Sequence, residues 1–206
     1  MKENKLSKKQ ETQKRIFDIV ISIAILIIVF PLMLIIAILI KITSKGEIIY
    51  KQKRITKNGK EFIMYKFRTM IKDAEKETGP ILAKVNDSRI TKIGKILRKT
   101  RMDELPQFLN VIKGDMSIVG PRPERKEILQ NIEKDFPEYK ERQNVKAGIT
   151  CIAHIKGDYY TKPKERLKYD KIYMEDWSLK KDVKIIFATI KKIVRQNIRK
   201  VENKES

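Results

Sequence analysis

Cysteine and histidine are almost absent from this sequence of 206 residues. Cys151 is the only cysteine, so no disulfide can form within the chain, and a reducing compartment is permitted. His154 is the only histidine, which excludes a metal site built from several histidines and means that any bound metal must be held largely by oxygen. The sequence also has no internal repeat and no glycine-rich phosphate loop of the P-loop or dinucleotide-binding type. The length suits one domain.

Acidic residues are few compared with basic ones: 26 Asp and Glu stand against 47 Lys and Arg, giving a formal net charge of +21. Such an excess implies anionic partners, which could be nucleic acid, anionic lipid or phosphorylated substrates. The cations are spread along the whole chain and match no nucleic-acid-binding motif, so we predict no nucleic-acid partner. A non-enzymatic, membrane-anchored basic protein that binds polyanions remains the alternative to an enzyme.

Residues 16–40 form an almost wholly apolar run, interrupted by Asp18, Ser22 and Pro31. At about 1.5 Å per residue, residues 19–40 are long enough to cross a hydrocarbon core of about 30 Å. We therefore predict a membrane-inserted helix at 16–40, preceded by a basic cytosolic arm at 1–15.

The path of this helix through the membrane is open at the level of sequence. Basic residues flank both ends of the run, which favours the cytoplasmic side for both ends. Pro31 removes a backbone hydrogen bond and can kink or break a helix. A re-entrant helix broken at Pro31 and a single span kinked there both fit the sequence.

The remainder, residues 41–198, is expected to form a domain at the cytosolic face, followed by a disordered tail at 199–206. Asn58-Gly59 predicts the turn of a β-hairpin with strands at 47–52 and 61–68. Helices are predicted at 92–99, 101–113, 124–134, 163–177 and 182–195, and strands near 116–119 and within 145–155. The helix at 182–195 is amphipathic and basic, so it could lie in a membrane interface or pack on the core. The fold class is thus α+β and mostly helical, with amphipathic interfacial helices.

Two adjacent carboxylates, Asp103 and Glu104, stand at a predicted helix start. Thr100 is the expected N-cap, and Pro106 falls in the first turn, where a missing N–H costs little. The helix dipole and upstream cations are expected to keep both carboxylates ionised and to attract an anion. A carboxylate pair also suits Mg²⁺, which shares its other positions with phosphate and water. Ordinary compensation of the helix dipole is the alternative interpretation.

Arg122 lies between two prolines, Pro121 and Pro123, each of which restricts the backbone. A guanidinium fixed in this way suits bidentate binding of phosphate. A salt bridge to a nearby carboxylate would explain the same residue equally well.

Several linked motifs occur in a fixed order: Lys14-Arg15-Ile16-Phe17-Asp18 before the apolar run, Tyr65-Lys66-Phe67-Arg68-Thr69-Met70, Asp103-Glu104-Leu105-Pro106-Gln107, residues 110–117 (NVIKGDMS) and Val119-Gly120-Pro121-Arg122-Pro123. With these motifs the chain resembles the bacterial sugar transferases, the monotopic phosphoglycosyl transferases that start glycan assembly on a polyprenyl phosphate. The resemblance covers roughly residues 14–195. No multi-span segment precedes the apolar run, so the chain is expected to be the minimal form of the family.

The resemblance implies that a UDP-sugar gives its sugar-1-phosphate to undecaprenyl phosphate and that UMP is released. Asp103 matches the family's nucleophile, which forms a covalent phospho-sugar intermediate, and Glu104 would help to hold Mg²⁺ or act on the incoming phosphate. The positions expected to bind phosphate or substrate are Lys66, Arg68, Arg98, Pro121, Arg122, Pro123 and Asp170. The family's membrane helix is re-entrant and broken at its proline, here Pro31. The site would face the cytosol at the bacterial inner membrane, where a nucleotide sugar and a polyprenyl phosphate meet.

One loop departs from the family pattern. Many members have Gly-Ile-Thr-Gly-Trp-Ala-Gln followed by Gly-Arg, whereas this chain has residues 148–154 (GITCIAH) followed by Gly157-Asp158. An acid therefore replaces the expected base, and Lys156 or Lys162 could compensate for it. Because this loop is expected to contact the nucleotide sugar, the identity of the sugar stays open. His154, which lies in this loop, is a residue type more often structural than catalytic when it occurs alone.

Overall fold

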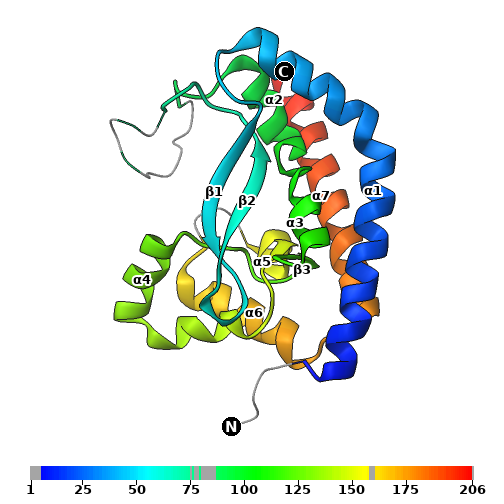
Figure 1. The fold of residues 1–206 in the computed structure, drawn as a ribbon, viewed down its shortest axis with the longest axis vertical. Helices are drawn as coiled ribbons and strands as arrows, with labels where there is room; N and C mark the ends of the chain where they lie inside the picture. The colour runs from blue at the N-terminus through cyan, green and yellow to red at the C-terminus, as the bar shows by residue number, and fades with distance from the viewer. Residues whose placement is uncertain (1–5, 75, 77–78, 80–86, 158–160, 206) are drawn as a thin grey trace.

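The computed structural model describes residues 6–74, 76, 79, 87–157 and 161–205, and the side chains among these as far as residue 198 (Figure 1). Asp158 therefore lies outside the described residues, and so does part of the predicted basic arm. The fold is mostly helical with a small antiparallel hairpin, as the sequence predicts.

Helix α1 (Lys8–Thr43) is the longest element and forms one edge of the molecule (Figure 1). It begins at a capping box in which Ser7 and Gln10 exchange hydrogen bonds between side chain and backbone. It also runs through Pro31 without interruption, so the prediction of a helix break at Pro31 is wrong. Proline removes one hydrogen bond, but the bonds on either side hold the helix together, and Figure 1 shows α1 curving over the domain in its last part.

In the first half of α1 the buried positions are polar, while many of its apolar residues face outward; farther along, Ile36 and Ile40 are buried. Lys14, Asp18 and Ser22 lie at successive i, i+4 positions and are 7%, 2% and 0% exposed. Ile27 and Ile28, in contrast, are 70% and 76% exposed. Among the described helices α1 is the one that is long and apolar enough to cross a membrane, and only 11% of the residues in its most apolar 18-residue stretch are buried. This arrangement is the reverse of a soluble core helix and suits a helix surrounded by lipid.

A short motif docks α1 onto the domain. Lys14 Nζ lies 2.6 Å from Asp182 Oδ2, and this carboxylate also accepts hydrogen bonds from the Tyr173 hydroxyl (2.9 Å) and the Trp177 indole N–H (3.1 Å). Asp18 Oδ1 accepts from the backbone N–H of Ile118 at 3.1 Å. Polar contacts therefore fix the angle at which the apolar helix leaves the domain.

Strands β1 (Ile49–Ile55) and β2 (Glu61–Phe67) form the predicted antiparallel hairpin, with Ile49 opposite Phe67. The turn between them includes the 3₁₀ segment η1 (Lys57–Gly59), in which Asn58 and Gly59 have φ of 58° and 73°. These are the positive φ values that Asn-Gly turns provide. The first strand begins two residues later than predicted.

The remaining elements follow as α2 (Lys92–Thr100), η2 (Met102–Glu104), α3 (Gln107–Lys113), β3 (Ser117–Val119), α4 (Lys126–Asp135), η3 (Pro137–Asn144), β4 (Gly148–Thr150), α5 (Ile152–Lys156), α6 (Pro163–Glu175) and α7 (Leu179–Glu205). Helix α4 starts two residues later than predicted, and residues 152–156 are helical, not extended. Helix α7 continues to Glu205, so the predicted disordered tail is helical up to that residue.

A parallel pair, β3 and β4, lies in the core and was not predicted as a pair. Ser117 pairs with Gly148 and Val119 with Thr150. At the end of this pair Gly120 and Gly148 approach so closely that a Cβ on Gly148 would lie 2.1 Å from the Gly120 nitrogen. Glycine is thus required at both positions, and the contact fixes the segment that continues into Pro121 and Arg122.

Candidate active site

The Asp103-Glu104 pair lies on η2, a short 3₁₀ turn between two helices. Arg101 adopts a left-handed conformation (φ 61°) that ends α2 and redirects the chain just before the pair. Thr100 belongs to the last turn of α2, where its hydroxyl donates to the Ile96 carbonyl at 2.9 Å. The prediction of Thr100 as an N-cap is therefore wrong, because its side chain bonds back into the preceding helix.

Glu104 is surrounded by cations from separate parts of the chain. Its Oε1 lies 2.8 Å from Lys66 Nζ on β2, 3.7 Å from Arg122 Nη1 and 3.9 Å from Arg101 Nη1. The Glu104 residue is only 8% exposed, so these charges act through little solvent. Although burial raises the pKa of the Glu104 carboxyl, the cations Lys66, Arg122 and Arg101 outweigh it and hold the pKa well below its usual range.

Asp103, the neighbouring carboxylate, has the opposite environment. It is 7% exposed, and its buried Oδ1 has no hydrogen-bond partner within the described residues. Burial and the charge of Glu104 raise the pKa of Asp103 to about 6, against the lowering effect of Lys66, Arg101 and Arg98. The surrounding cations thus strongly favour the ionised form of Glu104, whereas burial beside Glu104 makes Asp103 harder to ionise, although a pKa of about 6 still leaves it mostly ionised at pH 7.

Asn110 holds the two halves of this site together. It is fully buried on α3, where its Oδ1 accepts from the Tyr65 N–H at 3.0 Å and its Nδ2 donates to the Ile63 carbonyl at 2.7 Å. These bonds join α3 to β2 beside Lys66. The hairpin cation and the carboxylate that it contacts are thereby fixed relative to each other.

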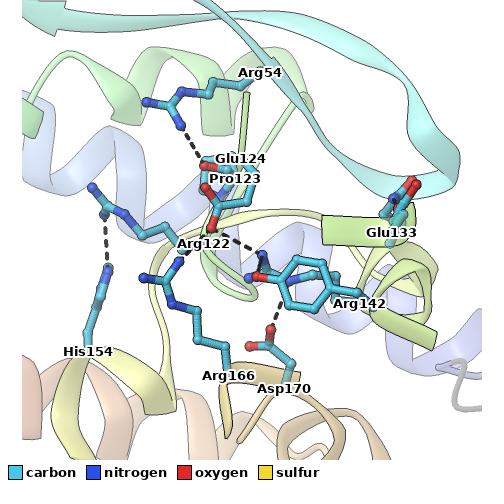
Figure 2. A network of polar contacts seen from close by, with 11 residues as sticks. Arg54, Arg122, Pro123, Glu124, Glu133, Arg142, His154, Arg166 and Asp170 are labelled. Carbon is cyan, nitrogen blue, oxygen red and sulfur yellow. Dashed lines mark hydrogen bonds and ion pairs between the residues drawn. The ribbon is translucent and has the colours of Figure 1, made fainter. Parts of the chain in front are cut away.

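Arg122 faces both a carboxylate and an imidazole. Besides Glu104, its Nη1 contacts His154 Nε2 at 3.1 Å (Figure 2). The Arg122 side chain is still 34% exposed, so the salt bridge and the binding of an external phosphate are compatible. Pro121 and Pro123 are both buried and fix the backbone on either side.

Two predicted phosphate-binding arginines make contacts elsewhere. Arg68 is buried and donates through Nη2 to the carbonyl and hydroxyl oxygens of Ser44, both at 2.8 Å, at the end of α1. Arg98 Nε donates to the Thr69 hydroxyl at 2.8 Å, and the Arg98 charge acts on the Asp103 carboxylate. Arg98 thus lies in the electrostatic environment of the pair, whereas Arg68 secures the connection between α1 and the hairpin.

Asp170 lies in a separate buried network (Figure 2). Its Oδ2 accepts from Arg142 Nε at 3.0 Å, and Arg142 and Arg166 both contact Glu124 Oε1, at 3.4 and 2.8 Å. Glu124 follows directly after Arg122-Pro123 in the chain. The structure therefore places Asp170 among the residues that support the Arg122 segment, and not among those described in contact with Asp103 or Glu104.

Sequence reasoning missed several contributors. His154 was not expected to contact Arg122, and the Lys14 and Asp182 pair has no local signal. The polar spacing of Lys14, Asp18 and Ser22 within an apolar run could have revealed the buried face of α1. Gln107 is 2% exposed, lies four residues after Asp103, and was not proposed as a site residue; among the described residues its Nε2 has no hydrogen-bond partner.

Metal binding at this site has to depend on few protein ligands. Within the described residues there is no group of three or more Asp, Glu, His or Cys side chains that could hold a metal. Asp103 and Glu104 supply two carboxylates, and the unpartnered Oδ1 of Asp103 is a free oxygen ligand. One or two carboxylates completed by substrate phosphate and water are what Mg²⁺ commonly takes, so the residues fit this ion.

An ionised carboxylate held among cations, beside a second carboxylate of raised pKa, is suited to phosphorylated ligands. The structure thus combines an apolar helix that is long enough to cross a membrane with a polar site that suits phosphorylated ligands.

Comparison with known proteins places the chain more narrowly. It belongs to the bacterial sugar transferase family, whose model matches residues 9–196.

Two relatives of this chain are named as transferases that act on undecaprenyl phosphate, and a third is named for exopolysaccharide production. The UDP-glucose:undecaprenyl-phosphate glucose-1-phosphate transferase of Klebsiella pneumoniae is 44% identical over 182 residues, covering 86% of this chain and 39% of that protein. The UDP-N-acetylgalactosamine-undecaprenyl-phosphate N-acetylgalactosaminephosphotransferase of Aeromonas hydrophila is 39% identical, covering 88% and 43%. The chain thus spans about two-fifths of the length of these two relatives. The exopolysaccharide production protein PSS of Rhizobium leguminosarum bv. phaseoli is 40% identical, and 92% of its length is covered.

Proposed function

We propose that this protein transfers a sugar-1-phosphate from a UDP-sugar to undecaprenyl phosphate, releasing UMP, as the first membrane step in the assembly of a surface glycan. The observation that carries the proposal is the contrast within the Asp103-Glu104 pair. Glu104 has three cations, Lys66, Arg122 and Arg101, around one carboxylate oxygen. Asp103, in contrast, has a buried oxygen with no partner among the described residues and a pKa raised to about 6. The names of the relatives supply the substrate class.

In the first step an oxygen of the ionised Asp103 carboxylate attacks the β-phosphorus of the UDP-sugar. The bond between this phosphorus and the bridging oxygen breaks, and UMP leaves with the electron pair. Lys66 and Arg122, which both lie close to the Glu104 carboxylate, neutralise charge on the phosphoryl oxygens. The raised pKa of Asp103 makes it the better nucleophile of the two carboxylates.

In the second step an oxygen of undecaprenyl phosphate attacks the same phosphorus. The bond from this phosphorus to Asp103 breaks, the carboxylate is regenerated, and the product is undecaprenyl diphospho-sugar. Glu104 keeps Lys66 and Arg122 in place through both steps. Mg²⁺, held by Asp103 and Glu104 together with the diphosphate, would supply further neutralisation of negative charge.

Contact with the bilayer follows from two exposed apolar surfaces. One is the outward face of α1, and the other is a face of α7 on which Phe187, Ile190, Val194 and Ile198 are 68%, 52%, 51% and 54% exposed. We propose that α7 lies in the interface and that α1, as an unbroken but curved helix (Figure 1), enters the inner membrane from the cytosolic face and returns to it. The site would then meet the lipid phosphate at headgroup depth.

The deciding experiment measures UMP release by detergent-solubilised protein given a panel of UDP-sugars with Mg²⁺, with and without undecaprenyl phosphate. We expect continuous turnover with the lipid and a single stoichiometric burst of UMP without it, as a covalent intermediate requires. Asp103→Asn should abolish both, while Asp176→Asn, a change at an exposed carboxylate, should have no effect.

Normal UMP release by Asp103→Asn would refute the assignment of the nucleophile. Absence of UMP with every sugar, combined with salt-sensitive binding of DNA and anionic lipid alike, would instead favour a basic polyanion-binding protein.

A further inference from the structure

His154 and Arg122 form a contact that neither residue type predicts. The imidazole Nε2 lies 3.1 Å from Arg122 Nη1 (Figure 2). The same guanidinium nitrogen lies 3.7 Å from Glu104 Oε1. Because a guanidinium can only donate, the Nε2 of His154 has to be the acceptor. The imidazole is therefore neutral and carries its proton on Nδ1.

The charges around His154 favour this neutral form. Arg122 follows β3, Arg101 lies between α2 and η2, Glu104 ends η2, and Lys66 comes from β2, so that these three cations outnumber the one carboxylate. Burial together with Arg122 lowers the pKa of His154 to about 3. The acceptor nitrogen thus stays available to Arg122 throughout the neutral range of pH.

The helix that carries His154 is held rigidly by α7. Helix α5 has five residues and is too short to be stable by itself. Lys192 Nζ donates to three carbonyl oxygens at its end, those of His154, Ile155 and Gly157, at 2.8, 3.0 and 2.9 Å. A cation at a helix C-terminus is a favourable partner for these carbonyls.

We propose that His154 is a positioning residue that fixes the guanidinium of Arg122 beside Glu104, in the orientation that receives the substrate phosphate. The distance of 3.7 Å between Arg122 and Glu104 is too long for a hydrogen bond, and a third of the arginine side chain is exposed. The imidazole therefore supplies the directional contact that the carboxylate does not. This inference rests on the proposed function only for the identity of the phosphate ligand.

Because His154 is the only histidine, ¹⁵N-histidine labelling reports it without overlap in the full-length protein. We expect a single neutral Nδ1–H tautomer that does not titrate between about pH 5 and pH 9. In Arg122→Ala the histidine should lose this preference and titrate closer to the ordinary value of about 6.5. A wild-type histidine that titrates near this value, or that carries its proton on Nε2, would overturn the proposal, whether or not the protein turns over a UDP-sugar.

Kinetics test the consequence for the site. His154→Leu keeps the bulk but has no acceptor, whereas His154→Gln provides an amide oxygen. We expect kcat/KM for the UDP-sugar to fall roughly tenfold in the leucine variant and to stay within about threefold of wild type in the glutamine variant. In an Arg122→Ala background, His154→Leu should cause no further loss.

A leucine variant with wild-type kinetics would show that the contact does not position Arg122. An undiminished loss from His154→Leu in the Arg122→Ala background would show that His154 acts by another route.

The role of α7 in holding α5 can be tested with two neighbouring lysines. Lys192→Met should reproduce the loss of kcat/KM seen in His154→Leu, while Lys191→Met, at an exposed position next to it, should not. Wild-type kinetics in Lys192→Met would exclude this lysine from the arrangement.

Discussion

Replacing Asp103 by asparagine should make the protein more stable while abolishing turnover. In the folded state the pKa of Asp103 is raised from 3.8 to about 6, because the carboxylate is buried beside Glu104. Its ionised form therefore destabilises the fold at neutral pH. Asparagine has nearly the same shape and carries no charge, so the substitution removes this cost.

The size and the pH dependence of the effect follow from this shift. A difference of about two units between the unfolded and folded pKa corresponds to a ceiling of about 3 kcal/mol. Between pH 3.8 and about 6 the folded protein binds more protons at Asp103 than the unfolded chain, so the contribution of this group to stability falls as pH rises and levels off above pH 6. The gain from Asp103→Asn should thus be largest at pH 8 and about half as large at pH 5.

Unfolding can be followed in detergent through the fluorescence of Trp177, the only tryptophan, which is 7% exposed. A gain of several degrees in the unfolding temperature is expected at pH 8. Glu104→Gln provides the opposite control, because it leaves Lys66 without its carboxylate and should cost about 3–5 kcal/mol. If Asp103→Asn were no more stable than wild type at pH 8, or gained more at pH 5, the electrostatic description of the pair would be wrong.

Three further outcomes are expected. In the proposed mechanism turnover requires ionised Asp103, so kcat/KM should fall roughly tenfold between pH 7 and pH 5, and a flat profile would contradict the raised pKa of this carboxyl. Lys14→Met leaves Asp182 buried without its cation and should lower the free energy of unfolding by about 3–5 kcal/mol, whereas Lys57→Met, which removes a partly exposed pair, should cost less than about 1 kcal/mol. Cysteines introduced at the two ends of α1 should both react with a cytosolic reagent, and labelling of the two ends from opposite sides of the membrane would refute the re-entrant path.

Local signals in the sequence predicted the elements that depend on neighbouring residues. Asn58-Gly59 has the backbone flexibility for its turn, and the hairpin formed there. Pro163 opens a helix on which Leu167, Asp170 and Tyr173 share a buried stripe, as their spacing indicates. The long apolar run forms the one described helix that is long and apolar enough to cross a membrane.

Features that depend on distant residues could not be predicted in this way. The ionisation of Asp103 is set by how deeply η2 is buried, by the charge of Glu104, and by cations from β2 and from the end of α2. The polar network of Asp170 requires Arg142, which is 28 residues away in the sequence. Likewise, Thr100 looks like an N-cap until the left-handed conformation of Arg101 separates the two helices. Sequence indicates which side chains are present in the site, but their charge depends on packing.

Helix α7 connects the proposed membrane contact with the site. Its outward face is apolar and exposed, while its inner face binds α1 through Asp182, contacts the Thr150 hydroxyl through Thr189 at 2.6 Å, and holds α5 through Lys192. From Lys192 the contacts continue through His154 to Arg122 and Glu104. If α7 leaves its place when the protein is extracted from lipid, the carbonyls of α5 lose their cation and Arg122 loses its fixed acceptor. The membrane would then contribute to the arrangement of the phosphate-binding cations as well as to the concentration of the lipid substrate.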